Sequence, residues 1–160
     1  MFLKNNTRLS NGWEYYTDDV YDGAPTKLTS SNSRNQITIN EATSIKTNTP
    51  AGYTALWSSD AIQANAAGEA FVCRVDFRCT AGTVGDYAEV QWDIGGGGSI
   101  IVAEKTLRFE KVGDTLISET VALFTGSTFA TNGCKLYLDT TSSGDTVDIF
   151  DIAILIQKVA

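Results

Sequence analysis

The fold is decided by one stretch of sequence, EAFVCRVDFRC at residues 69–79. Every second position from Phe71 to Cys79 is apolar, and most of the positions between them carry a charge. Side chains of a strand point alternately to its two faces. The pattern therefore predicts a half-buried antiparallel strand with one apolar face and one polar face.

Similar strands are predicted on both sides of this stretch. Strand-like runs occupy residues 36–40, 53–57, 86–94, 100–104, 106–111, 115–124, 135–139 and 146–158. Turn residues separate them, and Asn132-Gly133 predicts a type I′ hairpin turn. Only 60–67 and the C-terminal run are helix candidates, and the β-branched residues of the latter favour a strand. Short strands at this spacing indicate an all-β fold, an antiparallel β-sandwich of the jelly-roll kind.

Length, composition and charge limit the classes of partner. The 160 residues suit one domain with one core, and 42% hydrophobic residues indicate a globular chain. Twelve basic and 19 acidic side chains give a net charge of −7, so we expect neither nucleic acid nor an anionic membrane as partner. Residues 1–6 contain no apolar core of a signal peptide, so we expect synthesis in the cytosol.

The first 35 residues differ from the rest and predict an extended N-terminal arm with a linker, followed by a sandwich domain over 36–160. This segment has few aliphatic residues and no net charge, so it lacks the basic character of a genome-binding arm. Its aromatic residues need a surface on which to pack, either the chain's own sandwich or a neighbouring subunit. The candidate partner-binding residues of the arm are Trp13, Tyr15, Tyr16 and Tyr21.

The C-terminal run is apolar on both predicted faces. Strict alternation places Phe150, Ile152, Ile154 and Ile156 on one face. A sandwich strand normally buries one face, so a second apolar face indicates either a central covered strand or a subunit interface. The candidate interface residues on that second face are Ile149, Ala153 and Leu155.

The chain contains no histidine, which removes the Ser-His-Asp and Cys-His nucleophile systems and the most common general base. A glycosidase could still use two carboxylates, for which Asp76, Glu89 and Asp93 are the outward-facing candidates. Acidic residues on the outer face of strands are usually only solvated. We therefore expect no enzyme and no cofactor.

Cysteine and aspartate spacing predicts neither a disulfide nor a metal site. Cys73 and Cys79 fall in one strand, about 20 Å apart, too far for a disulfide. With Cys134 they are expected to be buried free thiols. Asp145, Asp148 and Asp151 are three apart, which places neighbours on opposite faces of a strand rather than around one calcium ion.

Two other features of the sequence bear on the binding of phosphate or sugar. Gly95–Gly98 precedes a strand and lacks the Lys-Ser/Thr pair of a phosphate loop, so it predicts a hairpin loop. An exposed Tyr87, with Trp57 or Trp13, could form a platform for a sugar ring. The alternative is that these aromatic residues pack within the fold or against the arm.

The second half of the chain resembles the jelly-roll domains of tailed-bacteriophage virion proteins of the head-decoration, head-fibre and fibre-tip kinds. The resemblance spans about residues 69–160. It lies in the pattern of strand and turn residues rather than in a motif of invariant functional residues. The segments that carry it are VQWDIGG at 90–96, LRF at 107–109, TVALF at 120–124, TFATNG at 128–133, VDIFDI at 147–152 and IQKV at 156–159. It implies a homo-oligomer, often a trimer, fixed to a larger particle.

The sequence and the resemblance together favour a capsid decoration protein on the virion surface. Its partners would be the major capsid protein or other virion proteins, and it would stabilise the shell by surface burial and by arm exchange. The alternative is a carbohydrate-binding or receptor-binding fibre-tip module with contacts at Trp57 and Tyr87.

Overall fold

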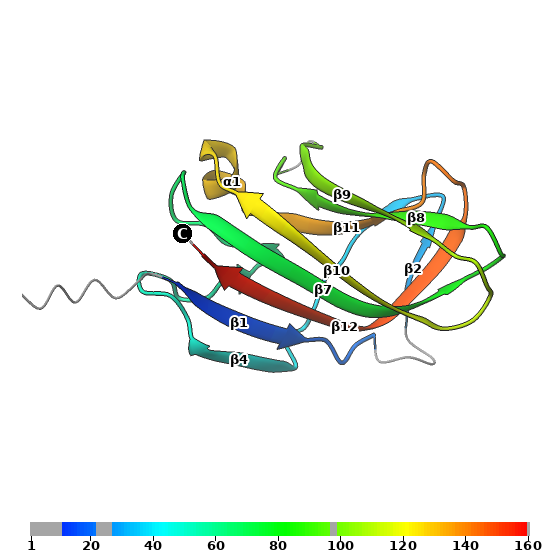
Figure 1. The fold of residues 1–160 in the computed structure, drawn as a ribbon, viewed down its shortest axis with the longest axis horizontal. Coiled ribbons are helices and arrows are strands. Elements are labelled where there is room, and N and C mark those ends of the chain that lie inside the picture. The colour runs from blue at the N-terminus through cyan, green and yellow to red at the C-terminus, as the bar shows by residue number, and fades with distance from the viewer. Residues whose placement is uncertain (1–10, 22–26, 97–98, 160) are drawn as a thin grey trace, which may run out of the picture.

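The computed structural model describes residues 11–21, 27–96 and 99–159. Within these ranges the chain is an antiparallel β-sandwich of the jelly-roll kind with one short helix (Figure 1). No helix in the described part of the chain is long and apolar enough to cross a membrane.

The first sheet contains six strands. Five of them lie side by side in the order β10 (Thr115–Phe124), β7 (Ala70–Ala81), β12 (Thr146–Lys158), β1 (Gly12–Thr17) and β4 (Thr43–Asn48). The sixth, β2 (Leu28–Ser31), pairs with the first residues of β12. The first and last strands of the domain, β1 and β12, are therefore direct neighbours in the middle of the sheet (Figure 1).

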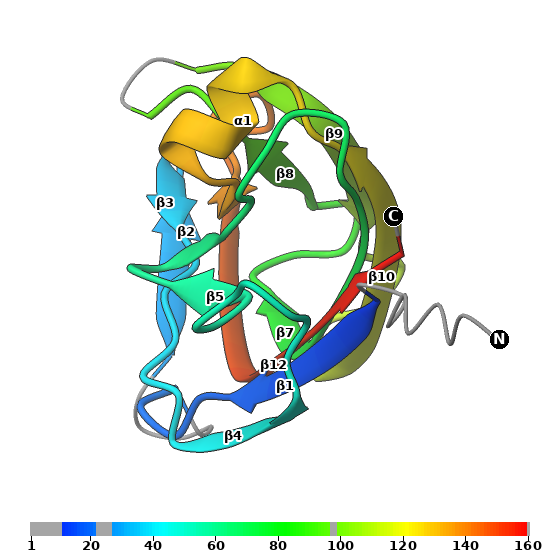
Figure 2. The ribbon, with the colours of Figure 1, turned by 90° about the vertical axis from the view of Figure 1, so that its left-hand side faces the viewer.

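The second sheet has the order β3 (Arg34–Gln36), β11 (Lys135–Asp139), β8 (Tyr87–Asp93) and β9 (Ile101–Arg108). A small hairpin of β5 (Trp57–Ser58) and β6 (Ala61–Ile62), together with α1 (Ser127–Asn132), lies across one end of the sandwich (Figure 2). This end is closed by buried aromatic residues, because Trp57 and Phe129 are each only 1% exposed.

The core lies between the two sheets, as the alternation over 69–79 predicted. The apolar positions of β7 from Phe71 to Cys79 are all completely buried, and Arg74 and Arg78 lie on the exposed face. The opposite wall of the core comes from Trp92 of β8 and from the leucines of β11. These side chains form one continuous hydrophobic cluster.

Three local predictions were wrong. Asn132-Gly133 is not a hairpin turn but the end of α1, where Gly133 adopts a φ of 72° and its N–H bonds the carbonyl of Phe129. Residues 60–67 contain β6 rather than a helix, because Ile62 pairs with Cys134. The runs 100–104 and 106–111 form a single strand, β9.

The predicted N-terminal arm is not separate from the sandwich in the described residues. β1 makes the full set of pairs from Gly12–Lys158 to Thr17–Ala153, and β2 and β3 also lie in the two sheets. Of the aromatic residues of the segment, Tyr16 and Tyr21 pack on the chain's own sandwich, which was one of the two alternatives, whereas Trp13 and Tyr15 stay partly exposed. The described residues therefore show no boundary at residue 35, and residues 1–10 of the predicted arm lie outside them.

Candidate functional site

The outer face of the first sheet carries a row of apolar side chains from three strands. Tyr15 of β1 lies directly opposite Leu155 of β12 on one side and Ile45 of β4 on the other. Thr17 is likewise opposite Ala153. Residues directly opposite in a sheet share a face. These four apolar residues form what we call the outer patch: Tyr15, Ile45, Ala153 and Leu155.

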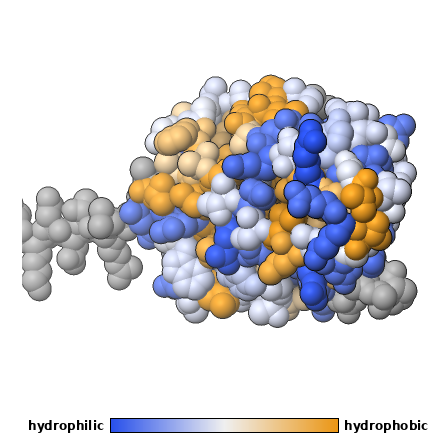
Figure 3. Space-filling model, turned by 45° about the vertical axis from the view of Figure 1, so that its right-hand side comes forward, coloured by the Kyte–Doolittle hydropathy of each residue, from blue (hydrophilic) through white to orange (hydrophobic). Residues whose placement is uncertain are grey.

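The outer patch is partly exposed and is bordered by charge. Ile45 is 42% exposed, Tyr15 and Leu155 are half-buried by their neighbours, and Ala153 is buried at 7%. On the next strand, Arg74 and Asp76 form an ion pair of 2.9 Å. On the face in Figure 3, hydrophobic side chains form separate groups among hydrophilic ones. Such a mixed surface is typical of the contact regions of proteins that also exist unbound in solution.

The structure separates the four predicted arm residues. Trp13 and Tyr15 point outward, but Tyr16 faces the core and is completely buried. Tyr21 is partly buried against the core cluster. Tyr16 therefore cannot contact a partner directly, contrary to the prediction. Side chains along β1 alternate between the two faces of the sheet, and this alternation places Tyr16 on the core face.

The predicted interface residues also divide into two groups. Ala153 and Leu155 lie in the outer patch, but Ile149 is completely buried in the core. The cause is a β-bulge, where Asp151 and Ile152 together oppose Phe77. The extra residue shifts the alternation, so the core face is formed by Ile149 before the bulge and by Ile152 after it.

The predicted glycan contact between Trp57 and Tyr87 is not supported by the fold. Trp57 is 1% exposed and closes one end of the core, so its face cannot stack on a ligand. Tyr87 is half-buried at the start of β8 in the second sheet. The alternation expected over 53–57 does not hold at its end, because Leu56 and Trp57 are both buried.

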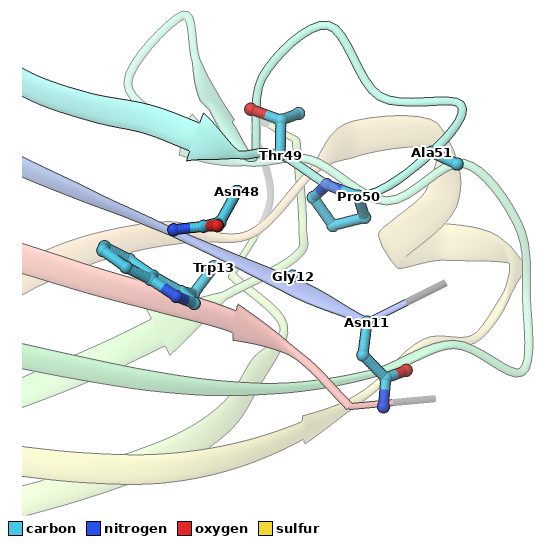
Figure 4. A pocket seen from close by; sticks show the side chains of 7 residues that line it. All are labelled: Asn11, Gly12, Trp13, Asn48, Thr49, Pro50 and Ala51. Atoms are coloured by element: carbon cyan, nitrogen blue, oxygen red, sulfur yellow. The ribbon is translucent and has the colours of Figure 1, made fainter. Parts of the chain in front are cut away.

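A groove that the sequence did not reveal lies at the N-terminal end of β1. It has a volume of about 440 Å³ and is formed by the first residues of β1 and the segment that follows β4. Figure 4 shows Trp13 and Asn48 beside each other, with Pro50 further along the groove. The residues that line it are Asn11, Gly12, Trp13, Asn48, Thr49, Pro50 and Ala51.

A buried carboxylate lies behind this groove. Glu14 is completely buried and accepts hydrogen bonds from the hydroxyls of Tyr16 and Thr49 and, at 2.5 Å, from the backbone N–H of Leu56. Burial and the bond to Glu14 raise the pKa of Tyr16 far above its usual range. These bonds tie the segment that follows β4 to β1.

The outer face of the second sheet is polar and acidic. Arg34 bonds Asp93 at 2.5 Å and Gln91 at 2.8 Å. Burial would raise the pKa of Asp93, but the N–H groups of Gly95 and Ile100 and the Arg34 guanidinium outweigh it and lower the pKa. Burial and the nearby Glu104 carboxylate raise the pKa of Glu89. Of the earlier carboxylate candidates, Asp93 is thus neutralised by Arg34, and Asp76 is paired with Arg74 on the other sheet.

The cysteines and the spaced aspartates have burial and hydrogen bonds that indicate roles within the fold. All three cysteines are buried and free, and burial raises the pKa of Cys73 and Cys79 to about 12. Asp145 accepts a bond from the N–H of Tyr87, and Asp148 from the hydroxyl of Thr29. In the described ranges, no three Cys, Asp or Glu side chains gather into a group that could hold a metal ion.

Comparison with known proteins identifies the fold. No family model matches the chain, and no curated protein does. Among solved structures, it is similar to the Eiger TNF from S. frugiperda, with a TM-score of 0.56 and 12% identity over 94% of this chain and 93% of that chain. It is also similar to PRD1 vertex protein P5, with a TM-score of 0.55 and 13% identity over 93% and 97%. At such identities, these similarities show a shared jelly-roll-like β-sandwich.

Proposed function

We propose that this chain is a structural protein of a phage particle, specifically a decoration protein that binds the outside of the capsid. Its partners would be the major capsid protein or other virion proteins, and it would carry out no catalysis. The sandwich shared with PRD1 vertex protein P5, a phage virion protein, supports the coarser part of this proposal. The resemblance of residues 69–160 to phage jelly-roll domains supports it independently.

The observation that carries the proposal is the outer patch. Tyr15 and Leu155 come from opposite ends of the chain and lie opposite each other on the outer face of the first sheet, where each stays partly exposed. Aromatic and aliphatic side chains on a broad, rigid sheet suit a flat protein surface. Apolar surface that the shell covers contributes about 25 cal/mol per Å² to binding, from which the entropic and desolvation costs of association are subtracted.

The mechanism follows from the strand order. Exchange of residues 12–36 between subunits would require each sandwich to open and to replace the pairs of β1 with β12 and of β3 with β11 by the same pairs from a neighbour. We therefore propose that the sandwich binds the shell through the face of its first sheet rather than through an exchanged arm. A shell with many identical sites would be stabilised by the sum of many such contacts.

The test is co-sedimentation of the protein with purified shells of the virus that encodes it. Tyr15→Arg and Leu155→Arg place a charge in the outer patch, and Thr106→Arg places the same charge on the exposed outer face of β9. We expect the patch variants to lower shell occupancy at least about tenfold, equivalent to 1.4 kcal/mol. The Thr106 variant should bind as the unmodified chain does.

Two outcomes would contradict the proposal. Full occupancy by both patch variants would show that another surface makes the contact. Absence of the protein from purified particles, measured by mass spectrometry, would exclude a virion role altogether. The trimer that the resemblance implies is tested separately by light scattering, where the 17.2 kDa chain should give about three times its mass.

A further inference from the structure

We propose that the groove beside Trp13 is a binding site for a neutral sugar. It lies at the N-terminal end of β1, where Trp13 pairs with Asn48 of β4 and with Gln157 of β12. Its volume of about 440 Å³ is in the range of small-molecule sites. This inference goes beyond shell binding and does not depend on it.

The chemistry of the lining selects the class of ligand. None of the seven described residues that line the groove has an ionisable side chain, so none of them offers an opposite charge to a charged ligand. Trp13 supplies a large aromatic surface, on which the apolar face of a sugar ring can stack. Within the described residues, the amides of Asn11 and Asn48 make no side-chain hydrogen bond. Each amide can donate and accept, as sugar hydroxyls require.

The groove is held in place before any ligand binds. Gly12 approaches β4 so closely that an added Cβ would lie 2.1 Å from the carbonyl oxygen of Asn48. Thr49 is fixed by bonds from its hydroxyl to Glu14 and, at 2.7 Å, to the carbonyl of Lys46. The ring of Pro50 restricts its own φ angle. A site that is already ordered loses less conformational freedom on binding.

The three tryptophans make the site measurable. Trp57 and Trp92 are 1% and 0% exposed, whereas Trp13 is partly exposed at the groove. A ligand in the groove should therefore change the emission of Trp13 alone. The probes are neutral oligosaccharides of glucose, galactose and N-acetylglucosamine, with sialylated oligosaccharides as charged counterparts.

We expect at least one neutral oligosaccharide to give a saturable fluorescence change. Trp13→Ala should abolish its binding, and Asn48→Ala should weaken it at least about tenfold. Trp13→Phe keeps an aromatic face and should retain binding. Both Trp13 variants are followed by calorimetry, because each of them lacks the fluorescent reporter. Tyr15→Arg, which changes the outer patch, is the matched control and should bind the sugar as the unmodified chain does. Cooperative unfolding of each variant establishes that it is folded.

Three results would overturn the inference. They are no saturable binding of any neutral oligosaccharide, unchanged affinity after Trp13→Ala, and tighter binding of the sialylated probes than of the neutral ones. The outcome is separable from the shell proposal. If Tyr15→Arg loses shell binding but keeps sugar binding, the outer patch alone is affected. If Asn48→Ala loses sugar binding but keeps shell binding, the groove alone is affected.

Discussion

The carboxylate of Glu14 lies buried against the hydroxyl of Tyr16 on the same strand, and both side chains face the core. The same carboxylate accepts bonds from Thr49 and from the N–H of Leu56. A single acidic residue thus joins β1 to the segment that lines the groove. Its partners are all neutral donors, so the carboxylate depends on them for stabilisation in the interior.

Replacement of Glu14 by alanine should strongly destabilise the fold. Glu14→Ala leaves two buried donors, the hydroxyl of Tyr16 and the N–H of Leu56, without this acceptor, while Thr49 keeps its bond to the carbonyl of Lys46. We therefore expect the free energy of unfolding to fall by about 2–4 kcal/mol. Glu14→Gln keeps one acceptor oxygen and should cost less. The measurement is urea unfolding, with Glu110→Ala as an exposed control that should change stability by less than about 0.5 kcal/mol. Equal stability of Glu14→Ala and the control would show that the network is not structural.

The β-bulge in β12 should depend on the residue at its left-handed position. Asp151 has a φ of 52°, and its N–H bonds the carbonyl of Tyr21 at 2.6 Å. Glycine tolerates this φ and a β-branched residue does not. Asp151→Gly should therefore leave stability unchanged or raise it slightly, and Asp151→Val should lower it by about 1–2 kcal/mol.

The matched control for the bulge is Gln157→Val, which introduces the same side chain at an exposed, regular position of the same strand. It should change the free energy of unfolding by less than about 0.5 kcal/mol. If the valine at 151 cost no more than the valine at 157, the left-handed conformation would not constrain this strand.

This bulge also explains where the sequence was informative and where it was not. Over 69–79 the alternation continues without interruption, so the buried face of β7 was predicted correctly residue by residue. In β12 the same rule failed, because an inserted residue shifts the faces and moves Ile149 into the core. Aspartate tolerates the left-handed region better than most residues, but Asp151 stands in a run of strand formers and gave no turn signal.

The candidate site was only partly predictable for a second reason. Tyr15 and Leu155 were both singled out, but their contact depends on the pairing of the first strand with the last. Pairing between strands so distant in sequence leaves no local signal. The groove at Trp13 was missed because Asn48 and Pro50 look like ordinary turn residues until β4 is placed beside β1.

Gly12 should be required by the close approach of β1 and β4. A side chain at this position would collide with the backbone of Asn48 and Pro50. Gly12→Ala must separate the two segments, and we expect a loss of about 1–3 kcal/mol. Gly126→Ala is the control, because a Cβ there meets nothing within 4 Å, so that only the N-cap preference of α1 is lost, at less than about 1 kcal/mol. Equal denaturation midpoints for the two variants would contradict the close approach.

The buried thiols should make the fold less stable as the solution becomes alkaline. Burial raises the pKa of Cys73 and Cys79 from 9.0 to about 12. Between these values the unfolded chain loses thiol protons that the folded chain keeps, so the free energy of unfolding falls as pH rises. Each thiol contributes a slope of up to about 1.4 kcal/mol per pH unit.

The thiol contribution is isolated by Cys79→Ala, compared with the unmodified chain in urea unfolding from pH 8 to pH 11. The variant has one titrating thiol fewer, so its stability should decline less steeply above pH 9, whatever its stability at pH 8. Burial also raises the pKa of Tyr16 and Tyr53, and these tyrosines are present in both proteins, so their contribution cancels in the comparison. Parallel pH profiles would mean that Cys79 ionises in the folded chain as readily as in the unfolded one, which is incompatible with a thiol buried in the core between the two sheets.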